Sequence, residues 1–312
     1  MKPVLFTSQR PLERAENLRT VYDAYQDPKM FLQLDANRRH NYISPRNFSL
    51  MVTDEYPAMS PGKVIMIWHA IEGGKTVGFD QPGPYICQRD IDVITRATAS
   101  GTGVIKRVWK TTGLPPERIV PTGLPRTDIY VGKRKGDGGT FLAGKRTYLY
   151  VPTFRTKRET NMPDLDWQWL DNELTDDELF AVKPHPITGH MITQDYRHIV
   201  EIPATEPSTN YLMDCDVVVS DYSSIIFDGY LLNKPSVLIE KVYGYTESRG
   251  MYMRYPVDYS SRFCTDEATM LKLCREADGL TATEQDVIDK VADMCDGHAT
   301  ERVIKLIEDI SR

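Results

Sequence analysis

The chain has 312 residues, and at roughly 150 residues per domain this length predicts two domains, each large enough to bury its own core. Hydrophobic residues make up 41% and charged residues 26% of the chain, a composition that excludes disordered and low-complexity proteins. The formal net charge of -6 excludes a broad basic face that covers nucleic acid, although screening over roughly 8 Å leaves room for local cationic pockets.

Neither a targeting segment nor a membrane anchor is expected. No stretch approaches the roughly 20 apolar residues that a membrane-spanning helix needs, and the start of the chain leads only into the short apolar run 4–6. The five cysteines are odd in number and form no Cys-x-x-Cys pair, so neither a disulfide framework nor a zinc site is indicated. We therefore expect a cytoplasmic protein with reduced thiols.

Short apolar runs that end in polar clusters predict strands buried on both faces of a parallel sheet, and amphipathic stretches between them predict helices. In chain order the predicted elements are a helix at 12–25, strands at 64–68 and 148–151, a helix at 167–179, strands at 179–182 and 217–219, a helix at 225–232, a strand at 237–239 and a helix at 301–310. Strands that alternate with helices indicate an α/β fold.

A glycine-dense run without apolar residues, 132–139, separates two α/β halves. We expect an N-terminal domain of residues 1–131 and a C-terminal domain of residues 132–312, with room for the terminal helix to pack back onto the N-terminal domain. Two halves joined by one linker leave a cleft, and clefts of this kind bind ligands.

Two segments have the frame of a phosphate-binding P-loop in the wrong context. In 139–146, Arg146 replaces the metal-binding hydroxyl and a strand follows where a helix should begin. In 69–76, His69 stands where the loop needs its first glycine. We therefore predict no P-loop nucleotide site.

A metal site is not predicted either. Asp164 and Asp166 could form a carboxylate pair, but they directly precede the helical pattern that begins at Trp167. Acidic residues at the start of a helix are ordinary capping and dipole partners, so we interpret the pair as a helix cap.

Four segments place polar residues just past a predicted strand, where ligands bind in open parallel sheets. In the first, the imidazole of His69 can take a proton from an alcohol near neutral pH, and Lys75 follows closely; a structural histidine is the alternative. In the second, Thr153 accompanies Arg155, whose planar fork suits a phosphate; a surface cation on a loop is the alternative.

The third segment holds His185 between two prolines, which would aim its ring rigidly or simply form a turn. The fourth, 220–224, is a serine loop between a strand and a helix. Its helix start would bind a phosphate through backbone N–H groups, or a serine would only cap the helix. Asp228 within that helix is either functional or structural.

These motifs together resemble the CDP-glycerol glycerophosphotransferase family, the primases and polymerases of teichoic acids and related capsular polymers. The matching segments are Trp68-His69-Ala70, Gly123 to Asp128, Pro152 to Arg155, His185-Pro186, Ser220 to Ser224 with Asp228, Asn233-Lys234-Pro235 and Arg249 to Tyr252. The resemblance implies a GT-B-like architecture, in which two Rossmann-like domains with parallel sheets face each other across a cleft. It also implies chemistry without a metal or a cofactor.

The resemblance implies that a hydroxyl of a lipid-linked or polymeric glycan attacks the β-phosphorus of CDP-glycerol, or of a related CDP-polyol, and that CMP leaves. His69 would act as the general base and His185 as the second catalytic residue, in contact with the pyrophosphate. The implied donor-binding residues are Thr153, Arg155, Ser220, Asp221, Ser223, Ser224, Asp228 and Arg249, and Lys75 and Arg126 would contact phosphate or acceptor.

Two other functions stay open. A GT-B glycosyltransferase that uses a nucleotide sugar would need the same pyrophosphate contacts. A binding module without catalytic activity is the second alternative, because Ala70 replaces the family's usual glycine and 71–75 departs from its usual sequence. A cytoplasmic transferase of this family would contact the inner face of the membrane only peripherally.

Overall fold

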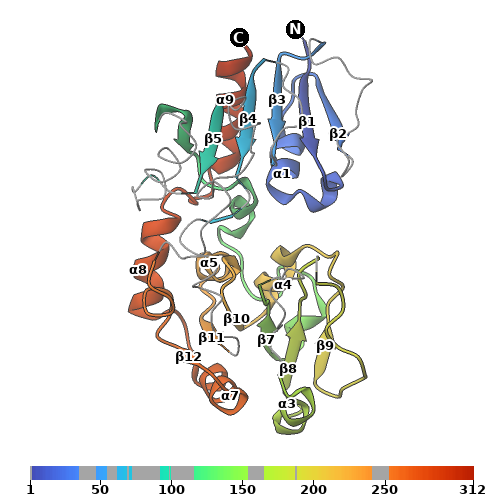
Figure 1. Ribbon diagram of the computed structural model, residues 1–312, viewed down its shortest axis with the longest axis vertical. Coiled ribbons are helices and arrows are strands. Elements are labelled where there is room, and N and C mark those ends of the chain that lie inside the picture. Colours follow the sequence, from blue (N-terminus) through green and yellow to red (C-terminus); the bar gives the residue numbers. More distant parts are fainter. Residues whose placement is uncertain are drawn as a thin grey trace. The chain divides into compact units, whose positions relative to one another are not determined.

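The computed structural model describes residues 2–34, 47–54, 62–68, 70–71, 92–97, 99, 116–153, 165–186, 188–240 and 253–312. These residues form two compact units (Figure 1). Unit 1 runs up to Val131 and also contains Lys290–Arg312, whereas unit 2 contains Gly132–Asp289. A parallel sheet with helices forms each unit, which confirms the predicted α/β fold.

In the described part of unit 1, a six-stranded sheet has the order β2-β1-β3-β4-β5-β6, and all neighbouring strands are parallel. Its elements are β1 (Val4–Ser8), η1 (Leu12–Arg14), α1 (Glu16–Ala24), β2 (Lys29–Gln33), β3 (Leu50–Thr53), β4 (Val64–Ile67), β5 (Val93–Arg96), η5 (Pro116–Arg118), β6 (Ile119–Pro121), η6 (Pro125–Tyr130) and α9 (Ala299–Ser311). This is the flavodoxin-like order, whose direction reverses between β1 and β3.

The core of unit 1 forms between the sheet and its helices. Alternate residues of β1, such as Val4 and Phe6, point to one face and are almost completely buried against α1 and α9. Val303 and Ile307 of α9 belong to the same cluster and are fully buried. The carboxylate of Asp128 accepts hydrogen bonds from the first two backbone N–H groups of α9, at 3.0 and 2.7 Å, and so caps this helix.

In the described part of unit 2, the six-stranded sheet has the order β12-β11-β10-β7-β8-β9 and is also parallel throughout. Its elements are η7 (Phe141–Gly144), β7 (Arg146–Tyr150), α3 (Trp167–Glu173), β8 (Glu178–Val182), β9 (Ile199–Glu201), α4 (Ser208–Asp214), β10 (Val217–Ser220), α5 (Ile225–Leu231), β11 (Ser236–Ile239), β12 (Phe263–Cys264), α7 (Glu267–Glu276) and α8 (Ala282–Val291). This is the Rossmann order, whose direction reverses between β7 and β10.

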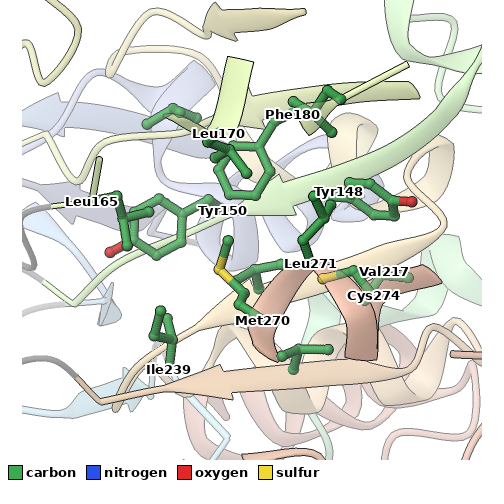
Figure 2. Close-up of a cluster of buried hydrophobic side chains, with 14 of the residues drawn as sticks. Tyr148, Tyr150, Leu165, Leu170, Phe180, Val217, Ile239, Met270, Leu271 and Cys274 are labelled. Atoms are coloured by element: carbon green, nitrogen blue, oxygen red, sulfur yellow. The ribbon is translucent and has the colours of Figure 1, made fainter. Parts of the chain in front are cut away.

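Large aromatic side chains fill the core of unit 2 (Figure 2). Tyr148, Tyr150 and Phe180 are fully buried, and the figure shows Met270 and Leu271 of α7 packed against the tyrosines. On the opposite face, α5 lies close to β10: a Cβ added at Gly229 would approach the Cγ2 of Val218 to 2.9 Å. Both faces are therefore covered, as the continuous apolar runs predict.

The strands predicted from these runs are confirmed within one or two residues at each end. The helix predicted at 167–179 is wrong in its second half: α3 ends at Glu173, and Glu178 already opens β8. At 139–146 the short helix η7 leads into β7, which confirms that a strand follows this segment where a P-loop would need a helix. Asp166 caps α3 through the N–H of Trp169, as expected.

Candidate functional site

The predicted donor-binding residues of unit 2 lie at the carboxyl ends of three adjacent parallel strands. Thr153 follows β7, His185 follows β8, and the segment 220–224 ends β10 and leads into α5. The sheet reverses direction between β7 and β10. Ligands of open α/β sheets bind at this point, outside the carboxyl ends of the strands.

Asp221 ties the segments that follow β7 and β10 to each other. One of its carboxylate oxygens accepts hydrogen bonds from the backbone N–H of Thr153 at 2.7 Å and of Tyr222 at 2.6 Å. Ser220 donates a hydrogen bond to the carbonyl oxygen of Val151 at 2.6 Å. Because Ser220 and Asp221 are buried, they act on the protein's own backbone and shape the loop.

Thr153 is 1% exposed, whereas His185, Ser223 and Ser224 are half-buried. Ser224 stands at the N-cap position of α5 with helical backbone angles, and its side chain makes no capping hydrogen bond. Simple helix capping therefore does not account for Ser224. Asp228, in the first turn of α5, is 1% exposed and lies inside the protein.

Lys183 was not among the candidate residues, yet it supports the segment that carries His185. This lysine is 2% exposed, and its ammonium donates to the carbonyl oxygens of Pro184 at 3.4 Å and Ala204 at 3.1 Å. The sequence signal for Lys183 is its place directly after an apolar strand and before a proline. Charged side chains are rarely buried without partners, so a lysine at such a buried position indicates a specific contact.

In unit 1, Arg126 is 8% exposed, and its backbone N–H donates to the side chain of Asn17. Both ends of the motif 123–128 lie against the segment that contains Met294 and the start of α9. Gly123 has φ of +81°, and a Cβ there would come within 2.1 Å of the carbonyl oxygen of Met294. At the other end of the motif, Asp128 caps α9.

The remaining predicted site residues, His69, Lys75, Arg155 and Arg249, lie outside the described residues. Their roles stay predictions. The structure therefore brings the predicted donor-binding residues that follow β7, β8 and β10 to one end of the unit 2 sheet, and it places Arg126 in unit 1.

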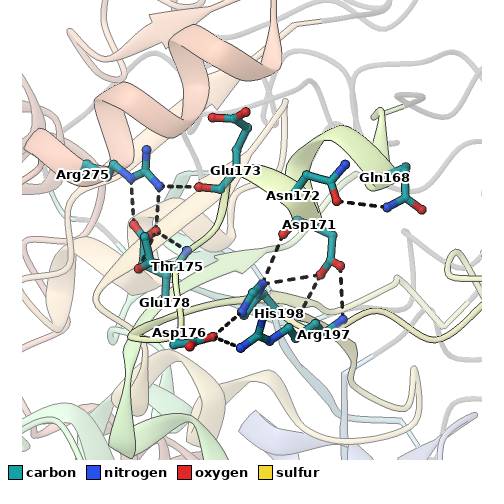
Figure 3. Close-up of polar contacts among 10 residues, drawn as sticks. All are labelled: Gln168, Asp171, Asn172, Glu173, Thr175, Asp176, Glu178, Arg197, His198 and Arg275. Atoms are coloured by element: carbon teal, nitrogen blue, oxygen red, sulfur yellow. Dashed lines mark hydrogen bonds and ion pairs between the residues drawn. The ribbon is translucent and has the colours of Figure 1, made fainter.

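A second polar cluster in unit 2 lies at the opposite edge of the sheet (Figure 3). His198 directly precedes β9 and its ring nitrogens lie 3.1 Å from the carbonyl oxygen of Asp171 and 3.1 Å from a carboxylate oxygen of Asp176. Its hydrogen bonds lower the pKa of Asp176, together with the charge of Arg197. Because this cluster lies at the amino ends of the strands, we interpret it as structural.

The described residues also bear on metal binding, membrane spanning and pockets. Among the described residues, no group of three His, Cys, Asp or Glu side chains is arranged to hold a metal ion. None of the helices described is long and apolar enough to cross a bilayer. A pocket between α3 and α7 is lined in part by Trp169, Leu271 and Arg275. Since Arg275 bonds Glu178 at the start of β8, this pocket borders the amino edge of the sheet.

Comparison with known sequences points to one family. A family model described as CDP-Glycerol:Poly(glycerophosphate) glycerophosphotransferase matches residues 15–309. The chain is 25% identical over 344 residues to the teichoic acid poly(ribitol-phosphate) polymerase of Bacillus spizizenii, covering 97% of this chain and 56% of that protein. It is 23% identical over 285 residues to the teichoic acid glycerol-phosphate primase of Bacillus subtilis, covering 85% of this chain and 74% of that protein.

The chain thus spans about half to three quarters of the length of these curated relatives. Among solved structures it is similar to the wall teichoic acid polymerase TagF, with a TM-score of 0.73 and 19% identity over 99% of this chain and 89% of that one. This likeness confirms the GT-B-like class of the fold. At such low identity, it carries no further conclusion about the ligand.

Proposed function

Because this chain belongs to the CDP-glycerol:poly(glycerophosphate) glycerophosphotransferase family, we propose that it transfers a polyol-phosphate unit from a CDP-polyol to a hydroxyl group of a glycan acceptor. Unit 2 binds the donor and unit 1 serves the acceptor. The donor is CDP-glycerol or a related compound such as CDP-ribitol, since relatives named for glycerol phosphate and for ribitol phosphate both match the chain.

The observation that carries this proposal is the convergence of the half-buried His185, Ser223 and Ser224, with the buried Thr153 beside them, on the carboxyl edge of the unit 2 sheet, at and beside the reversal of strand order. Hydroxyl groups, an imidazole and backbone N–H groups are suited to the oxygens of a pyrophosphate. Arg155 and Arg249, predicted from the family's motifs, supply the positive charge that the two phosphates require. The net charge of -6 does not oppose this, because salt screens exposed charges over roughly 8 Å and leaves room for a local cationic site.

In the proposed reaction, His69 accepts the proton of the acceptor hydroxyl. The acceptor oxygen forms a bond to the β-phosphorus, and the bond from that phosphorus to the bridging oxygen breaks. The bridging oxygen keeps its electron pair and leaves as part of CMP. In phosphoryl transfer, catalysis rests on positioning and on electrostatic stabilisation of the phosphoryl oxygens, which Arg155, His185 and Arg249 provide.

We also propose that the acceptor is a lipid-linked or polymeric glycan, that the protein meets it as a cytoplasmic enzyme in peripheral contact with the inner face of the membrane, and that no metal or cofactor takes part. Two observations support a glycan acceptor of this class: the motifs resemble those of the family, and the relatives are named for teichoic acid synthesis. If no metal takes part, CMP release should be unchanged in the presence of EDTA. Loss of CMP release in EDTA that added Mg²⁺ reverses would overturn this part of the proposal.

The experiment that tests the function measures CMP release from CDP-glycerol and from CDP-ribitol with a lipid-linked glycan acceptor, followed by the mass of the product. His69→Ala and His185→Ala should each lower turnover by 10²-fold or more, as expected for loss of a general base or of charge stabilisation. His298→Ala is the matched control, since His298 is exposed and, among the contacts described, its side chain pairs only with Glu301.

Each outcome separates the proposal from its alternatives. CMP release that persists in His69→Ala shows that the base is wrongly assigned. Release of UDP or GDP from nucleotide sugars, with no reaction of either CDP-polyol, identifies a glycosyltransferase instead. Binding of a CDP-polyol without CMP release from any acceptor identifies a binding module.

A further inference from the structure

The backbone of Trp68 is anchored on both sides by buried side chains from other elements. Trp68 directly follows β4 and is 3% exposed. Its N–H donates to the Oγ1 of Thr95 in β5 at 3.3 Å, and its carbonyl oxygen accepts from the Nδ2 of Asn17 in α1 at 3.2 Å. Thr95 is fully buried and Asn17 is 4% exposed, so neither hydrogen bond competes with water.

Asn17 makes a second backbone contact through the other end of its amide. Its Oδ1 accepts from the N–H of Arg126 at 2.9 Å. The amide has only one orientation that satisfies both partners, because the reverse orientation would oppose two donors at Arg126 and two acceptors at Trp68. The side chain of Asn17 therefore joins Trp68, the first residue of the motif 68–70, to Arg126 in the motif 123–128. Arg126 lies 109 positions from Asn17 in the sequence.

These two anchors fix the peptide groups that flank Trp68. The N–H belongs to the peptide before Trp68, and the carbonyl belongs to the peptide that leads into His69. With both planes held, the two backbone torsions of Trp68 have little freedom, since a peptide unit is itself planar. Asn17 and Thr95 therefore hold the backbone of Trp68, the residue directly before His69 in the sequence.

We infer that Asn17 and Thr95 are positioning residues for His69, acting through the backbone of Trp68. The inference rests on the proposed role of His69 as the general base. A base must lie within hydrogen-bond reach of the proton it removes, and a displacement of about 1 Å can lower the rate roughly 10²-fold. Neither side chain needs to touch the substrate for its loss to be felt in kcat.

The sharpest test uses a pair of substitutions at Thr95. Thr95→Val keeps the shape of the side chain and removes the acceptor for Trp68 N–H, whereas Thr95→Ser retains a hydroxyl. We expect Thr95→Val to lower kcat about tenfold or more with an unchanged KM for the CDP-polyol, and Thr95→Ser to restore most of the loss. Thr147→Val in unit 2 is the matched control, because it removes a fully buried hydroxyl that donates to the carbonyl oxygens of Leu142 and Lys145.

A substitution at Asn17 tests the other anchor. Asn17→Asp keeps an oxygen for the N–H of Arg126 and removes the donor to Trp68, so kcat per folded molecule should fall as in Thr95→Val. If Asn17→Asp does not fold, the pair at Thr95 decides alone. Wild-type kcat in Thr95→Val, whether or not its unfolding temperature falls, overturns the inference.

A readout independent of activity keeps failure of the inference apart from failure of the proposed function. In protein labelled with ¹³C-histidine, the ring signal of His69 is identified by its absence in His69→Ala. Thr95→Val should shift or split that signal and leave the other histidine signals in place, while Thr147→Val should not affect it. An unchanged His69 signal overturns the inference, and loss of activity in His69→Ala tests the proposed function separately.

Discussion

The carboxylate of Asp221 accepts a hydrogen bond from the backbone N–H of Thr153 at 2.7 Å, across 68 positions of the chain. This bond joins the segments that follow β7 and β10, the two strands between which the order of the sheet reverses. The same oxygen also holds the N–H of Tyr222. One buried carboxylate therefore sets the shape of the loops where we propose that the donor binds.

Asp221→Asn should weaken donor binding and stability together. The amide keeps the size of the side chain but replaces a charge-assisted acceptor by a neutral one, which costs about 1–2 kcal/mol of unfolding free energy. We expect the Kd for CDP-glycerol to rise about tenfold, since about 1.4 kcal/mol corresponds to that factor. Calorimetric titration and thermal unfolding measure the two effects, and an unchanged Kd would show that Asp221 has no part in the donor site.

Asp214→Asn is the matched case in which only stability should change. Its carboxylate accepts from the backbone N–H groups of Gly136 and Gly138 at 2.9 Å and of Thr140 at 2.7 Å, and from the Thr140 hydroxyl at 2.7 Å. We expect an unfolding free energy lower by about 2 kcal/mol and a wild-type Kd for CDP-glycerol. A weaker Kd would show that the segment held by Asp214 also shapes the donor site.

The pH dependence of this difference follows from the pKa of Asp214. Burial raises that pKa, but the hydrogen bonds from Thr140, Gly138 and Gly136 outweigh burial and lower it below the ordinary value of 3.8. A lowered folded pKa stabilises the fold above the unfolded pKa and less as the pH falls. The advantage of the wild type over Asp214→Asn should therefore shrink below about pH 4.

Arg275→Met should destabilise unit 2 in a pH-dependent way. Arg275 bonds both carboxylate oxygens of Glu178, at 2.9 and 2.7 Å, and these bonds are the largest cause that lowers the pKa of Glu178 to about 2 from 4.5. Because Arg275 is 39% exposed, solvent screening limits the loss to about 1–2 kcal/mol at pH 7. Urea unfolding should show this difference above pH 4.5 and a smaller one toward pH 2. Equal differences at pH 7 and pH 3 would exclude Glu178 as the cause.

Asp54→Asn should stabilise unit 1 at neutral pH. Asp54 directly follows β3 and is 3% exposed, and burial is the main cause that raises its pKa above the ordinary 3.8. The folded state then binds the proton more tightly than the unfolded state, so stability falls as the pH rises through the raised pKa. Asn at this position does not ionise. The unfolding temperature of Asp54→Asn should exceed that of the wild type at pH 7 and match it near pH 3, and a lower value at pH 7 would contradict the prediction.

The strands that were predicted come from short apolar runs buried on both faces, as in β10 and β11. The strands β1 and β3 are buried just as completely but were not predicted. The edge strand β2 escaped prediction because it is only partly buried and contains Lys29 and Gln33, and β12 has only two residues. The helix predicted at 167–179 was too long because Glu178 fits a polar helical position. In the fold, Glu178 is buried at the start of β8 and paired with Arg275, 97 positions away.

The candidate site could be predicted as a set of motifs but not as an assembly. Spacing after the strands indicates Thr153, His185 and Ser223, since strand ends are local features. The contacts that support them join distant parts of the chain, such as Asn17 with Arg126. An asparagine near the start of a helix has the pattern of an ordinary cap, so nothing local distinguishes Asn17.

The burial of Val303 and Ile307 of α9 in the core of unit 1 has a consequence for building hybrid enzymes. The polypeptide leaves unit 1 at Gly132 and returns to it at Lys290, near the end of α8. Exchanging the proposed donor-binding unit with that of a relative therefore requires two splice points. A single crossover at Gly132 would import a foreign α9 and leave the recipient sheet packed against a helix whose side chains evolved for a different core.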